Sequence, residues 1–133
     1  MAHVRRKFYD IHEAQASPLA SGALDFIRQL YQVEEPIRGK PPDERRRRRQ
    51  QAAVPILAAF KQLLEETLMQ VSQTSDLAKA IRYALSRWAA LTRYCEDGRI
   101  EIDNNAAERA LRGVALGRKN YLFAGSDQGG ERA

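Results

Sequence analysis

The sequence predicts a mainly α-helical fold, in which a helical hairpin or bundle is accompanied by one short strand. Two segments carry apolar residues at spacings of three and four, the period of an amphipathic helix. The first stripe consists of Leu57, Phe60, Leu64, Leu68 and Val71, and the second of Leu77, Ile81, Leu85, Trp88, Leu91 and Cys95. Only a short polar break separates them, so we expect two long helices that pack as an antiparallel hairpin, the second capped by Ser75.

Two further helices are predicted ahead of the hairpin. Ser17–Pro18 separates them, because the residue before a proline avoids helical backbone angles. Ser21 is expected to be the N-cap of the second helix, which Pro36 and Gly39 end. The apolar faces of the two helices are formed by Val4, Phe8 and Ile11, and by Leu24, Ile27, Leu30 and Tyr31.

A basic band connects these helices to the hairpin. Seven cationic and two anionic side chains lie between Arg38 and Gln50, so this band carries the whole net charge of +5. We expect a linker at 38–42 and then a basic helix from Asp43 to Pro55. The rest of the chain is neutral, which argues against a uniformly cationic DNA coat, while contact with a polyanion and a solvated helix face both remain open for the band.

The pattern changes after Glu96. Asp97–Gly98 indicates a turn, and residues 99–102 alternate polar and apolar side chains as a short strand does. Asn104 or Asn105 is the expected cap of a last helix that ends near Gly117, ahead of a loop-like tail.

Composition excludes several protein classes. Apolar residues make up 44% of the chain, which is enough for a core and argues against wholesale disorder. The longest nearly apolar run, residues 52–60, is far shorter than the roughly 18 residues that a membrane span needs. The N-terminus has no apolar signal core, so a cytoplasmic protein is expected. Cys95 is the single cysteine, which excludes a disulfide framework or a cysteine-based zinc site and favours a buried structural thiol.

Acidic residues around the last predicted helix form one candidate site. Glu101 and Asp103 lie on one face of the predicted strand, and Glu108 lies in the first turns of the helix. Carboxylates in this arrangement can converge on Mg²⁺, and a two-metal site of this kind cleaves phosphodiesters. Acidic residues early in a helix also interact favourably with its dipole, and on spacing alone that structural role is favoured.

Cationic residues form the other candidates. Arg109, Arg112, Arg118 and Lys119 surround the same helix, where they can hold a DNA phosphate or form ordinary ion pairs. A further candidate is the arginine run of the basic band, made of Arg45, Arg46, Arg47, Arg48 and Arg49. Its charge is spread around a whole helical circumference, which is compatible equally with a DNA-backbone contact and with a solvated face.

Longer motifs resemble a known family. Residues 103–112 (Asp-Asn-Asn-Ala-Ala-Glu-Arg-Ala-Leu-Arg) and 117–126 (Gly-Arg-Lys-Asn-Tyr-Leu-Phe-Ala-Gly-Ser) resemble the C-terminal signature of bacterial insertion-sequence transposases, those of family sixty-six in particular. Residues 2–8 and 83–88 resemble two further blocks of that family. The resemblance spans nearly the whole chain.

The resemblance implies a DDE transposase with an RNase H-like catalytic core, in which two Asp and one Glu hold two Mg²⁺ or Mn²⁺ ions. Such enzymes cleave and join DNA by attack of water or a 3′-hydroxyl on phosphate. Glu108 matches the family's glutamate and is therefore the expected catalytic and metal-binding residue. The two family aspartates lie upstream of the block at residues 2–8. The chain is accordingly expected to be a C-terminal fragment that binds no metal by itself and is inactive alone.

The resemblance also divides the chain. Residues 1–16 correspond to the end of the catalytic core before an insertion. Residues 17–97 correspond to the helical insertion with its basic band at 38–50. Residues 98–133 correspond to the return strand, the Glu-bearing helix and the C-terminal loop.

The expected partner is transposon-end DNA, with a second copy of the chain or the full-length transposase as possible protein partners and no membrane. The expected location is the bacterial cytoplasm, at the nucleoid. The residues expected to contact DNA are Arg45, Arg46, Arg47, Arg48, Arg49, Arg109, Arg112, Arg118 and Lys119. The alternatives are a non-enzymatic DNA-binding or regulatory helical protein and a purely structural helical bundle.

Overall fold

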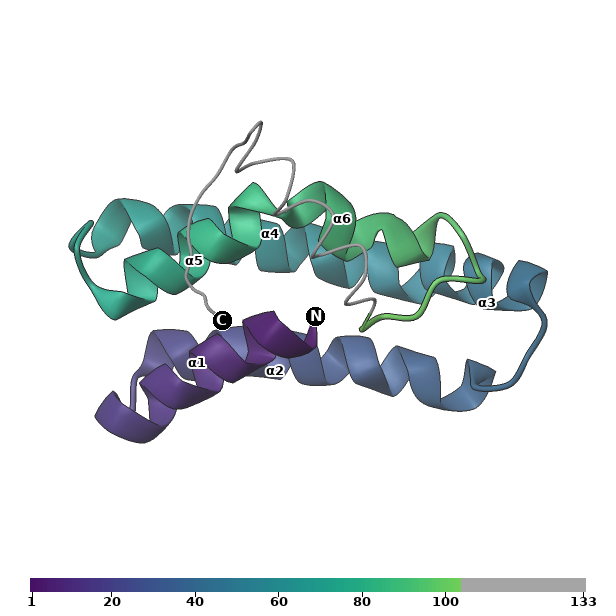
Figure 1. Ribbon diagram of the computed structural model, residues 1–133, viewed down its shortest axis with the longest axis horizontal. Helices are drawn as coiled ribbons and strands as arrows, with labels where there is room; N and C mark the ends of the chain where they lie inside the picture. The colour runs from purple at the N-terminus through teal and green to yellow at the C-terminus, as the bar shows by residue number, and fades with distance from the viewer. Residues whose placement is uncertain (104–133) are drawn as a thin grey trace, which may run out of the picture. The chain divides into compact units, whose positions relative to one another are not determined.

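Four long helices frame residues 1–103, the part of the chain that the computed structural model describes (Figure 1). They are α1 (Ala2–Gln15), α2 (Pro18–Glu34), α4 (Val54–Gln70) and α5 (Asp76–Ser86). Helix α2 packs against α1 and α4, and α5 packs against the same two helices, so the four close into a bundle. Two shorter helices, α3 (Pro42–Arg48) and α6 (Trp88–Thr92), adjoin α4 and α5. The prediction of a mainly α-helical fold is confirmed for this part.

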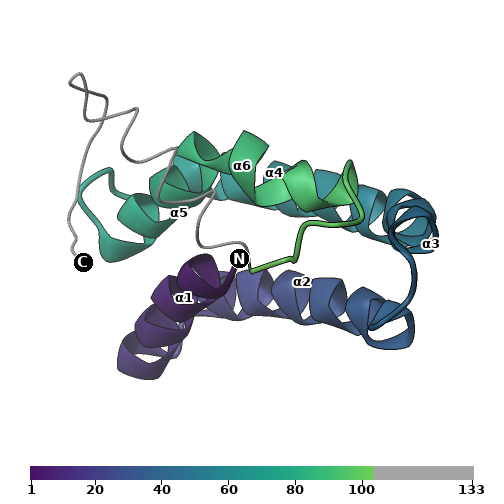
Figure 2. The same ribbon diagram turned by 45° about the vertical axis from the view of Figure 1, so that its right-hand side comes forward.

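The predicted apolar stripes meet inside the bundle. The buried members of the two long stripes are Leu57, Phe60, Leu64, Leu77, Ile81, Leu91 and Cys95. Helices α4 and α5 lie side by side and run in opposite directions, so the hairpin prediction is confirmed (Figure 2). The ring of Phe60 stacks on Phe26 of α2 at 5.6 Å between centroids and meets Trp88 of α6 edge-on at 5.7 Å. These aromatic contacts join α2, α4 and α6 across the core.

The start of α2 differs from the prediction. The hydroxyl of Ser17 accepts a hydrogen bond from the backbone N–H of Ala20 at 3.2 Å, and Pro18 occupies the first helical position. Proline suits that position because its φ is already helical and its missing N–H has no partner there. The prediction that Ser21 caps this helix is therefore wrong. Ser75 does cap α5, as predicted.

The basic helix and α4 follow one another through a π-helical turn, η2 (Arg49–Ala53). The basic helix was predicted to end at Pro55, and this boundary is wrong. Helix α3 already ends at Arg48, and Pro55 lies inside α4, which begins at Val54. Proline is tolerated there because Pro55 lies in the first turn of α4, where a backbone N–H has no partner within that helix. The short helix η1 (Glu35–Ile37) and Gly39, whose φ is 79°, lead out of α2 as predicted.

Residues 99–102 do not form the predicted strand. A short helix, η3 (Arg93–Cys95), leads to the predicted turn at Asp97–Gly98, and the chain then continues irregularly. The alternation is reflected in burial, since Ile102 is buried and Ile100 partly buried against the core. A strand also needs a second strand to pair with, and residues 1–103 offer none. No RNase H-like sheet occurs in this part of the chain.

Other predictions fall outside residues 1–103. These are the helix after Asn104 and the loop that follows it. Helix α1 and residues 98–103 belong to the same compact unit as the helices between them, Met1–Asp103. The division at residues 16 and 97 into catalytic core and insertion stays a prediction. No helix of the described part has the length and apolarity that crossing a bilayer requires.

Candidate nucleic-acid interface

The arginine run has an inner and an outer side. Arg46, Arg47 and Arg48 are exposed, whereas Arg45 is largely covered and Arg49 is completely buried. Residues on a helix point outward at steps of 100°, so a run of this length must place some members toward the bundle. Five identical side chains therefore occupy different surroundings and have different roles.

Arg49 is fixed by four hydrogen bonds. Its Nε and Nη2 donate to the two carboxylate oxygens of Glu34 at 2.9 and 2.7 Å. Its Nη1 donates to the backbone carbonyls of Tyr94 and Ile100, both at 2.8 Å. The guanidinium carbon also lies 4.9 Å from the centroid of the Tyr94 ring. These contacts place Arg49 in the interior and not on the surface predicted to meet DNA.

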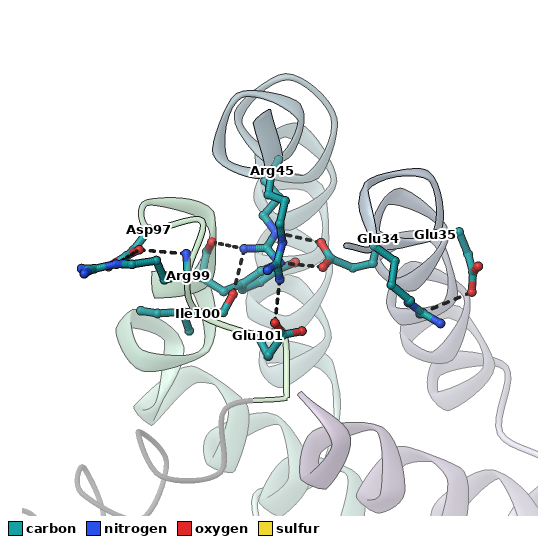
Figure 3. A network of polar contacts seen from close by, with 10 residues as sticks. Glu34, Glu35, Arg45, Asp97, Arg99, Ile100 and Glu101 are labelled. Carbon is teal, nitrogen blue, oxygen red and sulfur yellow. Dashed lines mark hydrogen bonds and ion pairs between the residues drawn. The ribbon is translucent and has the colours of Figure 1, made fainter. Parts of the chain in front are cut away.

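Arg45 also faces the protein. Its Nη2 donates to Glu101 at 2.8 Å, and only 14% of its side chain is exposed. Figure 3 shows the two side chains pointing toward each other, with Glu34 and Ile100 beside them. Arg46 is exposed, but its Nε donates to the backbone carbonyl of Glu96 at 3.1 Å. Arg45 and Arg46 thus tie α3 to the segment that follows η3.

The outer side of the run is an exposed cationic surface. We define the α3 basic surface as Lys40, Arg46, Arg47 and Arg48, all exposed. Arg47 and Arg48 form no ion pair with any residue of the described part, although Asp43 and Glu44 lie one helical turn before them. Guanidinium groups in this position are open to an external anion such as a DNA phosphate.

The two acidic residues predicted near the metal site have separate contacts. Glu101 pairs with Arg45, and Oδ1 of Asp103 accepts a hydrogen bond from the hydroxyl of Tyr31 at 2.6 Å. No group of three His, Cys, Asp or Glu side chains able to hold a metal occurs among residues 1–103. We therefore assign no metal site and no catalytic step to residues 1–103.

The remaining predicted site residues are not described by the structure. They are Glu108, Arg109, Arg112, Arg118 and Lys119. Their predicted catalytic, metal-binding and DNA-binding roles stay predictions.

Ionisation near the arginine run follows burial and pairing. Burial raises the pKa of the Cys95 thiol to about 11 and also raises the pKa of Tyr94. Both groups are neutral at physiological pH, which agrees with the structural role predicted for Cys95. Hydrogen bonds from Arg99 lower the pKa of Asp97 to about 2, so this carboxylate stays charged at the turn.

The Glu34–Arg49 pair was not predicted, yet the sequence holds a signal for both residues. Arg49, Ala53 and Leu57 are spaced four residues apart, so Arg49 lies on the same helical face as the buried apolar stripe of α4. Glu34 follows Leu30 by four residues on the buried face of α2. Two opposite charges in phase with two packed stripes indicate a buried pair.

Residues 1–132 match the family described as Transposase IS66 family. The chain belongs to this family. This IS66 chain is similar to uncharacterized protein y4qI of Sinorhizobium fredii (strain NBRC 101917 / NGR234), with 46% identity over 97% of the chain and 24% of that protein. It is also 40% identical to uncharacterized protein y4jD of the same organism, over 98% of the chain and 26% of that protein.

The IS66 chain therefore spans about a quarter of the length of these curated relatives. No solved structure matches it.

Proposed function

We propose that the chain is the C-terminal part of a DDE transposase and acts in DNA transposition. Family membership over residues 1–132 supports the assignment. In this proposal Glu108 supplies one of the three carboxylates that hold two Mg²⁺ or Mn²⁺ ions in an RNase H-like core. The two aspartates belong to the part of the family upstream of residues 2–8, so the chain alone does not cleave DNA.

The role that we propose for the described unit is to grip the DNA backbone through the α3 basic surface. The observation that carries this role is the division of the arginine run. Arg45 and Arg49 are used by the fold, whereas Arg47 and Arg48 are exposed and without an ion pair in the described part. Contacts of this kind recognise phosphates without reading sequence. Further DNA contacts are proposed for Arg109, Arg112, Arg118 and Lys119.

DNA binding by the purified chain tests this role. The logarithm of the association constant should fall linearly with the logarithm of salt concentration, because bound cations release counterions from DNA. Replacing Arg47 and Arg48 with Gln should reduce the slope by roughly 1.8, since each phosphate contact contributes about 0.9.

A charge-matched control is Arg6→Gln/Arg28→Gln. Both arginines are exposed and have a carboxylate partner on their own helix, Asp10 and Asp25. This control should leave the slope nearly unchanged. Binding that is absent or independent of salt, or an equal effect of the control, would rule out the α3 basic surface.

A metal-dependent nicking assay tests the catalytic part of the proposal. The chain alone should not nick DNA, because one carboxylate cannot hold two strongly hydrated Mg²⁺ ions. In a longer protein of this family, replacing the residue that corresponds to Glu108 with Gln should abolish strand transfer. Nicking by the chain alone that is lost in Glu108→Gln would overturn the fragment assignment.

The competing candidate is a non-enzymatic DNA-binding or regulatory protein. Two results together would favour this candidate. The chain would bind DNA, and the longer protein would keep its strand-transfer activity after Gln replaces the residue that corresponds to Glu108. Co-purification of the chain with the full-length transposase or with a second copy tests the proposed protein partners.

A further inference from the structure

The segment 97–103, which we call the anchored segment, has neither helix nor strand, yet four successive residues are tied to other elements. Each tie is a polar contact to a different part of the bundle. The Ile100 carbonyl accepts from Arg49, the Glu101 carboxylate from Arg45, the Ile102 carbonyl from the backbone nitrogen of Met1, and the Asp103 carboxylate from Tyr31. An irregular segment held at every step has a fixed path without secondary structure of its own.

Arg49 holds both ends of the loop that contains the turn. Its Nη1 reaches the carbonyl of Tyr94 before the turn and the carbonyl of Ile100 after it. The opposite edge of its guanidinium forms a two-point contact with Glu34 of α2. Between these two carbonyls, Gly98 lies so close to the backbone of Pro42 that an added Cβ would overlap the Pro42 carbonyl. One side chain therefore joins α2, η2 and the two arms of the loop.

We propose that Arg49 is a positioning residue that clamps the anchored segment to the bundle. The clamp holds the anchored segment at Ile100, three residues before Asp103, and Glu108 follows Asp103 by five residues in the sequence. The importance of the clamp for Glu108 rests on the proposed transposase function. The clamp itself rests only on contacts within residues 1–103.

The chemistry of the guanidinium explains why this position carries arginine. The guanidinium donates two hydrogen bonds to the Glu34 carboxylate on one side and two to the carbonyls of Tyr94 and Ile100 on the other. A planar group with five N–H donors can form all four at once. A lysine ammonium is a compact charge with three donors, so it can neutralise Glu34 without spanning to Tyr94 and Ile100. A role limited to charge balance and a role as a clamp thus predict different results for Arg49→Lys.

Cys95 is a built-in reporter of the clamp. It is the single cysteine of the chain, it follows Tyr94 directly, and it is only 2% exposed. Its backbone carbonyl accepts from the side-chain amide of Gln50 at 2.6 Å. Because burial disfavours the thiolate and blocks access, a thiol reagent should label Cys95 slowly in the intact protein. Release of the loop should expose the thiol and speed the labelling.

The experiment measures three properties of the full chain: the labelling rate of Cys95, amide hydrogen exchange in α4 and α5, and Tm. The variants are Arg49→Met and Arg49→Lys, with Arg48→Met and Arg48→Lys as controls at the exposed neighbouring position. Arg49→Met should lower Tm, because it leaves Glu34 buried without a counter-charge. Arg49→Lys should recover much of the Tm that Arg49→Met loses. In Arg49→Lys, Cys95 should be labelled at least about tenfold faster than in the unaltered chain, while amide hydrogen exchange in α4 and α5 stays unchanged. The Arg48 variants should change none of these quantities.

Two results would overturn the clamp. Labelling in Arg49→Lys within twofold of the unaltered chain would mean that Arg49 serves only to balance Glu34. Labelling that rises together with exchange in α4 and α5 would mean general destabilisation. If Arg49→Met does not fold, Arg49→Lys alone decides between these outcomes. None of these measurements uses DNA or metal, so failure of the clamp and failure of the transposase proposal are separate results.

Discussion

Ala16 has the left-handed conformation that usually belongs to glycine. Among the non-glycine residues of the described part it alone has a positive φ, 51°, and its N–H donates to the carbonyl of His12 at 2.7 Å where α1 ends. This conformation costs an L-residue about 1–2 kcal/mol. Ala16→Gly should therefore increase the free energy of unfolding by about 1 kcal/mol, because the greater freedom of glycine in the unfolded chain offsets part of the gain.

Urea denaturation checks the Ala16→Gly prediction. Ala14→Gly is the matched control, since Ala14 is exposed inside α1 and loses helix propensity on the same change. The control should be destabilised by about 1 kcal/mol. If both variants were destabilised equally, the chain would not turn at Ala16 as described.

Gly98 is required for space. A Cβ added there would lie 1.8 Å from the carbonyl oxygen of Pro42, which is backbone and cannot rotate away. Gly98→Ala should lower the free energy of unfolding by about 1–3 kcal/mol, as overpacking at a close contact does. Gly39→Ala is a useful comparison, because open space surrounds Gly39 and only its φ of 79° opposes a side chain. A Gly98→Ala protein as stable as the parent would show that the turn and α3 do not touch.

At the scale of elements, two serines at the start of α2 can be distinguished by mutation. Ser17 accepts from the N–H of Ala20, whereas Ser21 is exposed inside the helix. Ser17→Ala should cost about 1 kcal/mol, the usual effect of losing an N-cap. Ser21→Ala should be neutral or stabilise by a few tenths of a kcal/mol, because alanine has the higher helix propensity. Thermal unfolding measures both, and the reverse order would place the cap at Ser21.

Helix positions were predictable and some of their ends were not, for a physical reason. The apolar stripe of α4 repeats over several turns, so many residues indicate the same helix and the same buried face. An end depends on one or two residues, and both Ser17 and Ser21 have a side chain suited to capping. Burial at Ile102 was likewise readable from alternation, but a strand depends on a pairing partner that no local pattern reveals.

At the scale of the whole molecule, the different roles within the arginine run come from tertiary structure. Arg48 and Arg49 are adjacent and chemically identical, yet one is exposed and the other is completely buried. The difference arises because Glu34, on another helix, supplies a buried carboxylate at 2.7 Å. The basic band was correctly located by composition, whereas the assignment of each arginine to surface or interior needed the packing of α2 against η2.

The first residue and the end of the anchored segment lie together, as Figures 1 and 2 both show. The buried apolar residues of the described part also form one core cluster, which extends from Met1 to Ile102. Neighbouring ends and a core of its own are the features of a unit that folds independently. We therefore expect a chain that ends at Asp103 to keep a helical circular dichroism spectrum and to unfold cooperatively in urea.

A chain that ends at Thr92 is the matched control for this truncation. It loses Tyr94, Cys95 and Ile102 from the core, together with both carbonyls that hold Arg49. Removing one buried aromatic side chain already costs about 3–5 kcal/mol, which is a large part of the stability of a small domain. The control should therefore lose its cooperative transition. If the chain ending at Asp103 lost it as well, residues 104–133 would be part of the folding unit.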